Sequence, residues 1–292
     1  MLITDFLDYA AGQLGAADLC FGHGTNNPID EAYFLVLGAL QIEFEVDSTQ
    51  LQRNLSASEQ NLLEDLLTKR LKQRIPVAYI LGFTMFAGYR FIVDSRALIP
   101  RSPIAELILR GYEPFVREPV LKILDLCTGG GCIGIASALE IPEAKVDLVD
   151  ISTDALELAG KNVEAHKLER RVSLLQSDLF DKITGHYQLI VCNPPYVSSQ
   201  ELRTLPREYK FEPELGLYSG DKGLSIPLRI LKSAADYLTE SGVLILEVGY
   251  SKQDLIDRYP HVPFLWLEFE HGGDGVLVMN KAQLLEYRDC FI

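Results

Sequence analysis

The 292-residue chain has few of the features that mark secreted or membrane proteins. It contains five cysteines, an odd number, and none of them forms a C-x-x-C pair. We therefore expect reduced thiols and no disulfide framework. No apolar run approaches the ~18 residues of a membrane span. The N-terminus carries Asp5 and Asp8 where a secretory signal has basic residues, so we expect a cytoplasmic protein with no membrane partner.

Positive charge is scarce as well. The chain has 27 Lys and Arg residues against 41 Asp and Glu residues, which gives a formal net charge of -14. Binding along nucleic-acid phosphates needs an excess of Lys and Arg, so we expect no direct nucleic-acid substrate. A basic protein partner is compatible with this charge. The five histidines are scattered without the spacing of metal ligands, and we expect no metal site.

Residues 1–78 have the pattern of a small helical domain. Apolar residues recur at helical spacing after Thr4, which we take as a candidate N-cap. Pro28 suits the start of a second helix, and Ser56-x-x-Glu59 is a capping-box pattern that predicts a third. Residues 79–101 are rich in aromatic and β-branched types and are interrupted by glycines. They predict a β-hairpin that joins two domains.

From residue 102 to 292 strands and helices alternate, which predicts an α/β domain with a mainly parallel, Rossmann-like sheet and helices on both faces. A glycine-rich turn near the C-terminus predicts an antiparallel hairpin at the end of the sheet. The expected strands are 121–126, 146–149, 172–175, 187–192, 243–248, 264–269 and 276–279. The expected helices are 104–111, 132–139, 155–166 and 228–238.

A glycine-rich loop, Gly129-Gly130-Gly131, directly follows the first of these strands, and its glycines allow close approach of the backbone to a ligand. Asp150 ends the next strand, where an acid can accept the hydroxyls of a ribose. Asp178 follows the third strand and could meet an adenine edge, although a helix cap or surface acid explains it equally well. A tight turn without a ligand, or a dinucleotide site, are the alternatives for the loop.

Asp125, before the loop, favours one cofactor. An acid there would repel a pyrophosphate, whereas it suits the cationic ammonium of a methionine moiety. The pattern therefore predicts S-adenosylmethionine. The candidate cofactor-binding residues are Asp125, Cys127, Thr128, Gly129, Gly130, Gly131, Asp150, Ile151, Asp178, Leu179 and Asn193.

The tetrapeptide Asn193-Pro194-Pro195-Tyr196 follows the buried strand predicted at 187–192. Proline supplies no N–H to a sheet, so the strand stops and Asn193 lies at its carboxyl end, where open α/β sheets bind ligands. The Asn193 oxygen and the Pro194 carbonyl could accept two N–H groups of a planar amide or amine and orient its nitrogen. Asn193 and Pro194 are therefore the candidate catalytic residues. Pro195 and Tyr196 complete the substrate-binding set, with a proline-rich turn and a packing Tyr as the alternative for the tetrapeptide alone.

Two further features flank this motif. Residues 197–223 are long for a connection between a strand and a helix, so we expect a lid or substrate wall, with a solvated surface loop as the alternative. Glu247 ends the following strand and could face the site, although a structural acid fits equally well.

Together, the glycine-rich loop, Asp150 and Asn193-Pro194-Pro195-Tyr196 resemble class I S-adenosylmethionine-dependent methyltransferases that act on planar sp² nitrogens. That group includes N6-adenine DNA methyltransferases and protein glutamine methyltransferases. The helical N-terminal segment, the hairpin and Leu98-Ile99-Pro100-Arg101 resemble the second branch, the protein N5-glutamine methyltransferase family, over essentially the whole chain. The resemblance implies a class I methyltransferase fold and methylation of a glutamine side-chain amide. We expect the helical domain of residues 1–78 to recognise the substrate.

Within that branch, the signature segments are similar to those of enzymes that modify large-subunit ribosomal protein uL3. The segments are Gly22-His23-Gly24-Thr25, Asn27-Pro28, residues 99–104 and residues 272–276. Release-factor enzymes typically have Arg-Pro-Glu-Thr where this chain has Ser102-Pro103-Ile104. The resemblance therefore implies uL3 as the protein substrate, with release factors or adenine in nucleic acid as alternatives. Two hypotheses from other functional classes remain: a non-catalytic interaction protein and a dehydrogenase.

Overall fold

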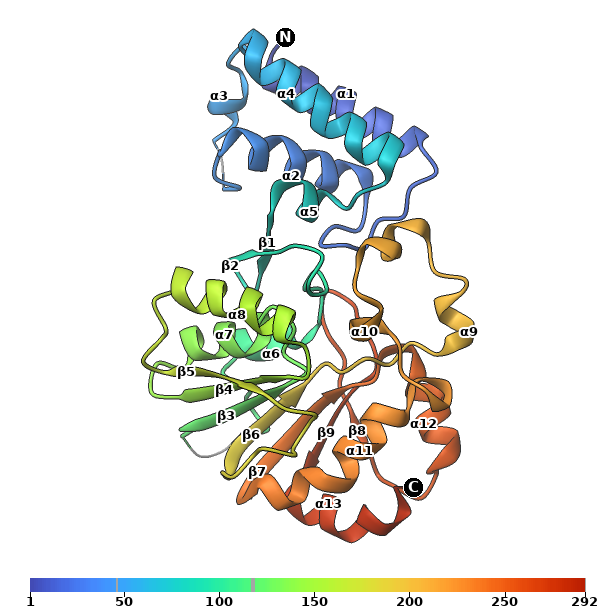
Figure 1. Ribbon diagram of the computed structural model, residues 1–292. Helices are drawn as coiled ribbons and strands as arrows, with labels where there is room; N and C mark the ends of the chain where they lie inside the picture. Colours follow the sequence, from blue (N-terminus) through green and yellow to red (C-terminus); the bar gives the residue numbers. More distant parts are fainter. Residues whose placement is uncertain (46, 117–118, 292) are drawn as a thin grey trace.

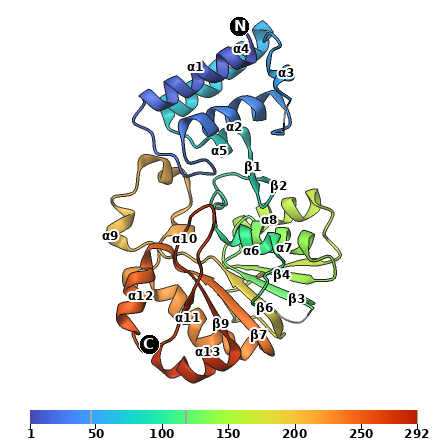
Figure 2. The ribbon, with the colours of Figure 1, turned by 180° about the vertical axis from the view of Figure 1, so that it is seen from behind.

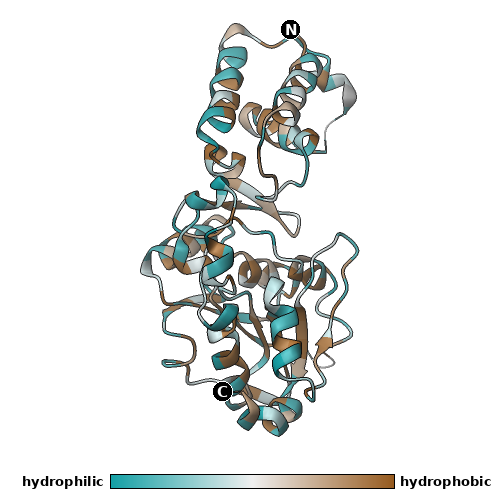
Figure 3. Cartoon of the chain, turned by 90° about the vertical axis from the view of Figure 1, so that its right-hand side faces the viewer, coloured by the Kyte–Doolittle hydropathy of each residue, from teal (hydrophilic) through white to brown (hydrophobic). Residues whose placement is uncertain are grey.

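The computed structural model describes residues 1–45, 47–116 and 119–291. A bundle of helices at the N-terminal end lies above a short β-hairpin, and a sheet flanked by helices forms the rest of the molecule (Figure 1). The strands of the sheet are mostly apolar, while the outer helices alternate between apolar and polar stripes (Figure 3). Among the described helices, none combines the length and the apolar character that a membrane span needs.

The N-terminal helices form a core of their own. Leu14, Leu35 and Leu63, from three different helices, are fully buried in it. The elements are α1 (Ile3–Ala16), α2 (Pro28–Leu40), α3 (Ser48–Leu51), α4 (Ala57–Thr68), a π-helical turn (Lys69–Gln73) and α5 (Val77–Leu81). The predicted helical start of the chain is thus confirmed.

Two predicted helix caps have different outcomes. The capping box at Ser56 and Glu59 is confirmed, since each side chain bonds the other's backbone N–H at the start of α4. The prediction of Thr4 as an N-cap is wrong: α1 begins at Ile3, and the Asp5 carboxylate accepts a hydrogen bond from the N–H of Leu2. This is the carboxylate half of a capping box, since an acid at the third helical position accepts from the N–H of the residue before the helix.

The hairpin between the two parts is shorter than predicted. Strands β1 (Phe83–Phe86) and β2 (Tyr89–Ile92) pair antiparallel, as expected. Residues 79–81, however, belong to α5, which starts after Pro76 and ends at Gly82. Gly82 has φ 74°, a left-handed conformation that ends a helix at little cost for glycine.

The described residues of the second part form one seven-stranded sheet of order β5-β4-β3-β6-β7-β9-β8. The pairs from β5 to β7 are parallel, and β7-β9 and β9-β8 are antiparallel, so the predicted parallel sheet with a C-terminal hairpin is confirmed. The order reverses between β3 and β6, where such sheets bind ligands. The strands are β3 (Lys122–Leu126), β4 (Lys145–Asp150), β5 (Val172–Gln176), β6 (Tyr187–Cys192), β7 (Leu238–Glu247), β8 (Leu265–Trp266) and β9 (Val276–Asn280).

Helices cover both faces of the sheet because alternate strand residues point to opposite sides. Ile123 joins the core under α7, and the next residue, Leu124, joins the core under α11. Helix 228–238 was predicted too long, since Leu238 already begins β7. Helices α12 and α13 were not predicted. The helices are α6 (Ile104–Leu109), α7 (Cys132–Glu140), α8 (Thr153–Ala165), α11 (Ser225–Ser233), α12 (Lys252–Arg258) and α13 (Lys281–Tyr287).

The segment 197–223, which we call the insert, carries two short helices, α9 (Ser199–Leu202) and α10 (Glu214–Leu217), and a 3₁₀ turn over Arg207–Phe211. Both views place it beside the hairpin and below the N-terminal helices (Figures 1 and 2). Its Glu208 side chain is fully buried, so the insert is not a solvated loop along its length.

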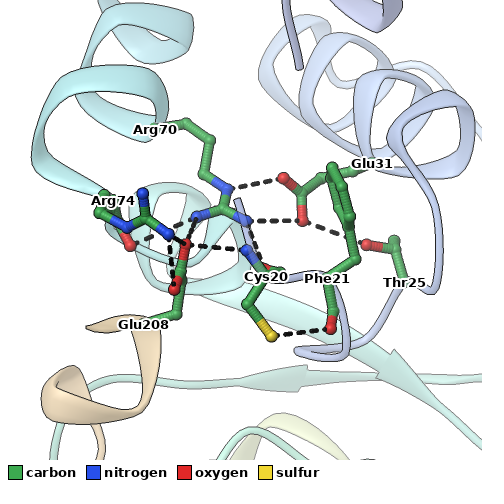
Figure 4. A network of polar contacts seen from close by, with 7 residues as sticks. All are labelled: Cys20, Phe21, Thr25, Glu31, Arg70, Arg74 and Glu208. Carbon is green, nitrogen blue, oxygen red and sulfur yellow. Dashed lines mark hydrogen bonds and ion pairs between the residues drawn. The ribbon is translucent and has the colours of Figure 1, made fainter. Parts of the chain in front are cut away.

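A buried ionic network, centred on Arg70, joins the insert to the N-terminal helices (Figure 4). The Arg70 guanidinium is 1% exposed. Its Nε lies 2.6 Å from Glu31 of α2, its Nη1 lies 3.3 Å from Glu208, and its Nη2 donates to the Cys20 carbonyl at 2.8 Å. Arg74 adds a second ion pair to Glu208 at 3.0 Å. One cation therefore binds α2, the loop before it and the insert together.

Arg70→Leu tests this network. The substitution leaves the Glu31 carboxylate buried without its ion-pair partner and takes one of two arginines from Glu208, which should lower the free energy of unfolding by about 3–5 kcal/mol. Urea unfolding measures the loss. Arg53→Leu is the matched control, because the Arg53–Glu59 pair is partly exposed and the change should be much smaller. Equal losses in both variants would contradict the assignment.

Candidate active site

A cavity of about 1380 Å³ lies at the carboxyl ends of the parallel strands, between the sheet, the insert and the loop that follows α1. Most of the predicted site residues line it. They are Cys127, Thr128, Gly129, Gly130, Asp150, Ile151, Leu179, Asn193, Pro194, Pro195 and Tyr196. Three other predicted residues, Asp125, Gly131 and Asp178, are not part of its wall.

The glycine-rich loop is shaped by two different requirements. Gly129 has φ 54° and donates its N–H to the Asp150 carboxylate at 2.9 Å, which presents the loop to the cavity. At Gly131 a Cβ atom would lie 2.9 Å from Ile135, and at Gly134 it would lie 2.3 Å from Leu148. These last two glycines therefore serve close packing of α7 on the sheet, one of the roles of glycine in such loops.

Asp125 lies beneath the loop and is 1% exposed. Its Oδ2 accepts hydrogen bonds from the Thr128 hydroxyl at 2.6 Å and from the Gly134 N–H at 2.9 Å. Its Oδ1 is buried without a hydrogen-bond partner among the described residues. Burial raises the pKa of Asp125 to about 7. A nearby cationic ligand would stabilise such a carboxylate, but Asp125 does not line the cavity, so its predicted contact with the ammonium of S-adenosylmethionine stays a prediction.

Asp150 faces the cavity at the end of β4. Its two oxygens accept the N–H groups of Gly129 and Ser152, each at 2.9 Å. Burial raises the pKa of this carboxyl. Each carboxylate oxygen has a further lone pair, so Asp150 can still accept the hydroxyls of a ribose. Asp150 thus lines the cavity, and its contact with a ribose stays a prediction.

The ends of β3 and β5 also carry unusual backbone. Cys127 has φ 56° and Leu179 has φ 47°, which is rare for residues with a side chain. Both line the cavity, and such strain is concentrated at ligand sites. Asp178, next to Leu179, points elsewhere: its carboxylate pairs with Arg229 at 3.0 Å. Its predicted contact with adenine stays a prediction.

Asn193 follows the last residue of β6 and is half-buried in the cavity wall. Its side-chain amide makes no hydrogen bond to the described part of the chain. The next residue, Pro194, is buried. A half-buried amide with free donor and acceptor capacity is available to a ligand. The structure thus brings Asn193 to the same cavity as the cofactor residues.

Tyr196 is held in place from several sides. Its hydroxyl donates to Glu247 at 2.9 Å, and the Ser102 hydroxyl donates to the other oxygen of that carboxylate at 2.5 Å. A Cβ at Gly249 would lie 2.4 Å from the Tyr196 ring, so only glycine leaves room for it. Ser251 donates to the Tyr196 carbonyl at 2.8 Å. Burial raises the pKa of both Glu247 and Tyr196, and the nearby carboxylate raises that of Tyr196 further.

The wall formed by the insert was not predicted in detail. Glu212 receives two hydrogen bonds from Arg101, at 2.6 and 2.8 Å, and one from the N–H of Ile99 at 3.0 Å. Burial raises the pKa of Glu212, but His23 and Arg101 outweigh it and hold the pKa at about 2. The His23 ring packs on Tyr209 with centroids 4.6 Å apart. No local pattern marks Glu212, since its partners lie about a hundred residues or more away in the sequence.

Comparison with known proteins adds independent findings. The family model described as Methyltransferase small domain matches residues 113–206, and that described as PrmC N-terminal domain matches residues 7–82. A protein of Francisella tularensis named ribosomal protein uL3 glutamine methyltransferase is 44% identical over 292 residues, which is 99% of this chain and 93% of its own length. A protein of Bordetella pertussis with the same name is 41% identical over 285 residues, 97% of this chain and 96% of its own.

Solved structures are more distant. A methyltransferase from Pyrococcus furiosus has 17% sequence identity and a TM-score of 0.48, over 78% of this chain and 99% of its own.

Asp125→Asn separates the charge of the buried acid from its shape. The pKa of about 7 in the folded wild type lies above the ordinary 3.8, so the unfolded chain ionises first as the pH rises. The wild type therefore loses stability from about pH 4 to pH 7, and the loss levels off above pH 7. Asn has no charge to bury. Across that pH range, the free energy of unfolding of the variant should therefore rise relative to that of the wild type by up to about 4 kcal/mol.

Urea unfolding of both proteins at several pH values measures this difference. Saturating S-adenosylmethionine should reduce the loss in the wild type, because a cation near the carboxylate lowers its pKa. A difference that does not change with pH would refute the assigned protonation of Asp125.

Proposed function

The chain belongs to the family of the ribosomal protein uL3 glutamine methyltransferases, and from this premise we propose its substrate and the roles of its site residues. It is an S-adenosylmethionine-dependent protein glutamine methyltransferase. We propose that it methylates the side-chain amide nitrogen of a glutamine in ribosomal protein uL3. The observation that carries the proposal is the unpartnered amide of Asn193 in the cavity that Asp150 and the glycine-rich loop also line.

The reaction asks for orientation more than for a base. A carboxamide nitrogen is a poor nucleophile because its lone pair is delocalised. Bound S-adenosylmethionine would supply a methyl group already activated by the positive sulfur. A nitrogen–carbon bond would form, the carbon–sulfur bond would break with its electron pair going to sulfur, and the nitrogen would then lose a proton to water. The protein must hold the nitrogen in line and stabilise its N–H groups as they become more acidic.

Asn193 and Pro194 meet these needs in the proposal. The Asn193 oxygen and the Pro194 carbonyl accept the two N–H groups of the glutamine amide and so direct its lone pair. A neutral acceptor suits this position, because an aspartate would pair with the sulfonium and stabilise the ground state. The Tyr196 hydroxyl is already bonded to Glu247, so Tyr196 offers the substrate its ring face.

The charge of the chain agrees with a basic protein substrate. A net charge of -14 favours a partner rich in Lys and Arg over the phosphates of a nucleic acid. We therefore extend the proposal to exclude a direct nucleic-acid substrate. Since ribosomal proteins are made and assembled in the cytoplasm, the proposed activity belongs to that compartment.

The substrate is tested by offering two proteins at once. With tritiated S-adenosylmethionine, label should enter purified uL3 in preference to a release factor present at the same concentration. Preferential labelling of the release factor would show that the release factor, not uL3, is the substrate. Label in added RNA or DNA would show that the methyl acceptor is a nucleic acid. Loss of the label from a uL3 variant with the target glutamine replaced by alanine locates the modified residue.

Asn193→Ala tests the assigned chemistry. Removing one acceptor of the transition-state N–H groups should lower kcat about 100- to 1000-fold, roughly 3–4 kcal/mol. Calorimetry should show cofactor affinity nearly unchanged. Asn193→Gln is the control for position, because it keeps the amide but moves it by one methylene, and it should not restore turnover. Turnover near that of the wild type in either variant would contradict the role of Asn193.

A further inference from the structure

A second, smaller cavity of about 270 Å³ lies between α2 and β1, and we call it the α2–β1 groove. Figure 1 shows α2 lying across the top of the hairpin that contains β1. Three apolar side chains of the groove are markedly exposed: Tyr33 by 41%, Phe44 by 38% and Met85 by 38%. Large apolar side chains gathered around one opening mark an interaction site more often than isolated ones do.

The floor of the groove consists of aromatic rings that pack on one another. The Phe44 ring packs on Phe34 with centroids 5.7 Å apart, and Phe34 packs on Phe83 at 5.6 Å. Leu37 is almost completely buried below them. An occupant would therefore meet a preformed aromatic surface and would not have to order it, which lowers the cost of binding.

Acidic residues lie in the groove or next to its lining residues in the sequence. Asp30 lines it, and Glu43 and Glu45 are exposed on either side of Phe44 in the sequence. The Arg90 guanidinium lies 3.6 Å from the centroid of the Phe83 ring and offsets part of this charge. An apolar centre with a mainly acidic rim is complementary to an apolar side chain flanked by lysine or arginine.

A single stretch of chain separates the groove from the active-site cavity. Gly22 and Asn26 line the large cavity, and Gly24 and Thr25, between them in sequence, line the groove. This stretch is held in place because the Thr25 hydroxyl donates to Glu31 of the Arg70 network, at 3.3 Å. A folded protein that places a glutamine in the large cavity thus presents neighbouring residues to the groove.

We propose that the α2–β1 groove is a docking site for the same basic protein that delivers the glutamine. It takes an apolar side chain of that protein with lysine or arginine beside it. The inference rests on the proposed function and adds a specificity subsite to it. Binding energy gained here, away from the reacting amide, selects one folded substrate over short peptides that also contain glutamine.

The double variant Glu43→Lys/Glu45→Lys tests the rim. Both residues are exposed and belong to no part of the catalytic or cofactor site. The KM for intact uL3 should rise about 10-fold because the rim now repels the substrate, with kcat and the cofactor Kd unchanged. Glu143→Lys/Glu169→Lys is the matched control: it makes the same charge change at exposed positions before β4 and β5, at the amino ends of the strands. The control should keep the wild-type KM.

Met85→Ser tests the apolar centre. It should raise the KM for uL3 several-fold, since the exposed methionine no longer contributes apolar contact. A short peptide that contains the target glutamine and cannot span both cavities should react equally with the wild type and all variants. A KM for uL3 that stays unchanged in both the Glu43/Glu45 and Met85 variants would overturn the proposal.

Failure of the groove and failure of the proposed function give different results. If the wild-type enzyme does not label uL3, the proposed function is refuted. If the wild-type enzyme labels uL3 and the groove variants have the same KM as the Glu143/Glu169 control, only the docking proposal is refuted. Sedimentation that shows a dimer of this chain dissociated by Met85→Ser would assign the groove to self-association and also overturn the proposal.

Discussion

The shape of the active-site cavity depends on one buried cation, Arg70. A guanidinium taken out of water needs partners on every side, and here they come from α2, the loop after α1 and the insert. If any one of these segments moves away, the buried guanidinium loses at least one of its hydrogen-bond acceptors. Such a network contributes less to stability than its contacts suggest, because desolvation offsets the attraction. What it secures is geometry: the loop and the insert that line the cavity keep fixed positions relative to the helices.

Buried acids do similar work on the sheet side of the cavity. Asp125 fixes the glycine-rich loop from below through Thr128, and Glu247 fixes Tyr196 from the end of β7. In each case a carboxylate that never needs to contact the substrate orients a group that lines the site. Reactions that depend on aligning a weak nucleophile gain most from groups already held in place. The energetic penalty of burying these acids, visible in their raised pKa values, is the expected counterpart of that rigidity.

Local signals in the sequence were sufficient for much of this arrangement and insufficient for the rest. Strand and helix alternation, the capping box at Ser56 and the proline stop after β6 are short-range effects, and each was predictable. The partners of Arg70 and Glu212 were not, because the contacts join residues between 39 and 138 positions apart and many Glu and Arg residues could have filled them. Short elements were also missed: α12 and α13 have too few turns to show a clear period.

The same contacts bear on whether the insert is a lid or a wall, a question that the sequence left open. A lid must open on the timescale of turnover, so its closed contacts have to be weak. The insert is instead attached twice through buried carboxylates, by Glu208 to Arg70 and by Glu212 to Arg101. Opening would separate both ion pairs at once, although hydration of the exposed charges would offset part of the lost attraction. These two attachments favour a wall over a lid, so we expect a protein substrate to bring its glutamine into a cavity that is already formed. Selection among glutamines then falls to the surfaces around the entrance, since an amide pocket recognises every glutamine alike.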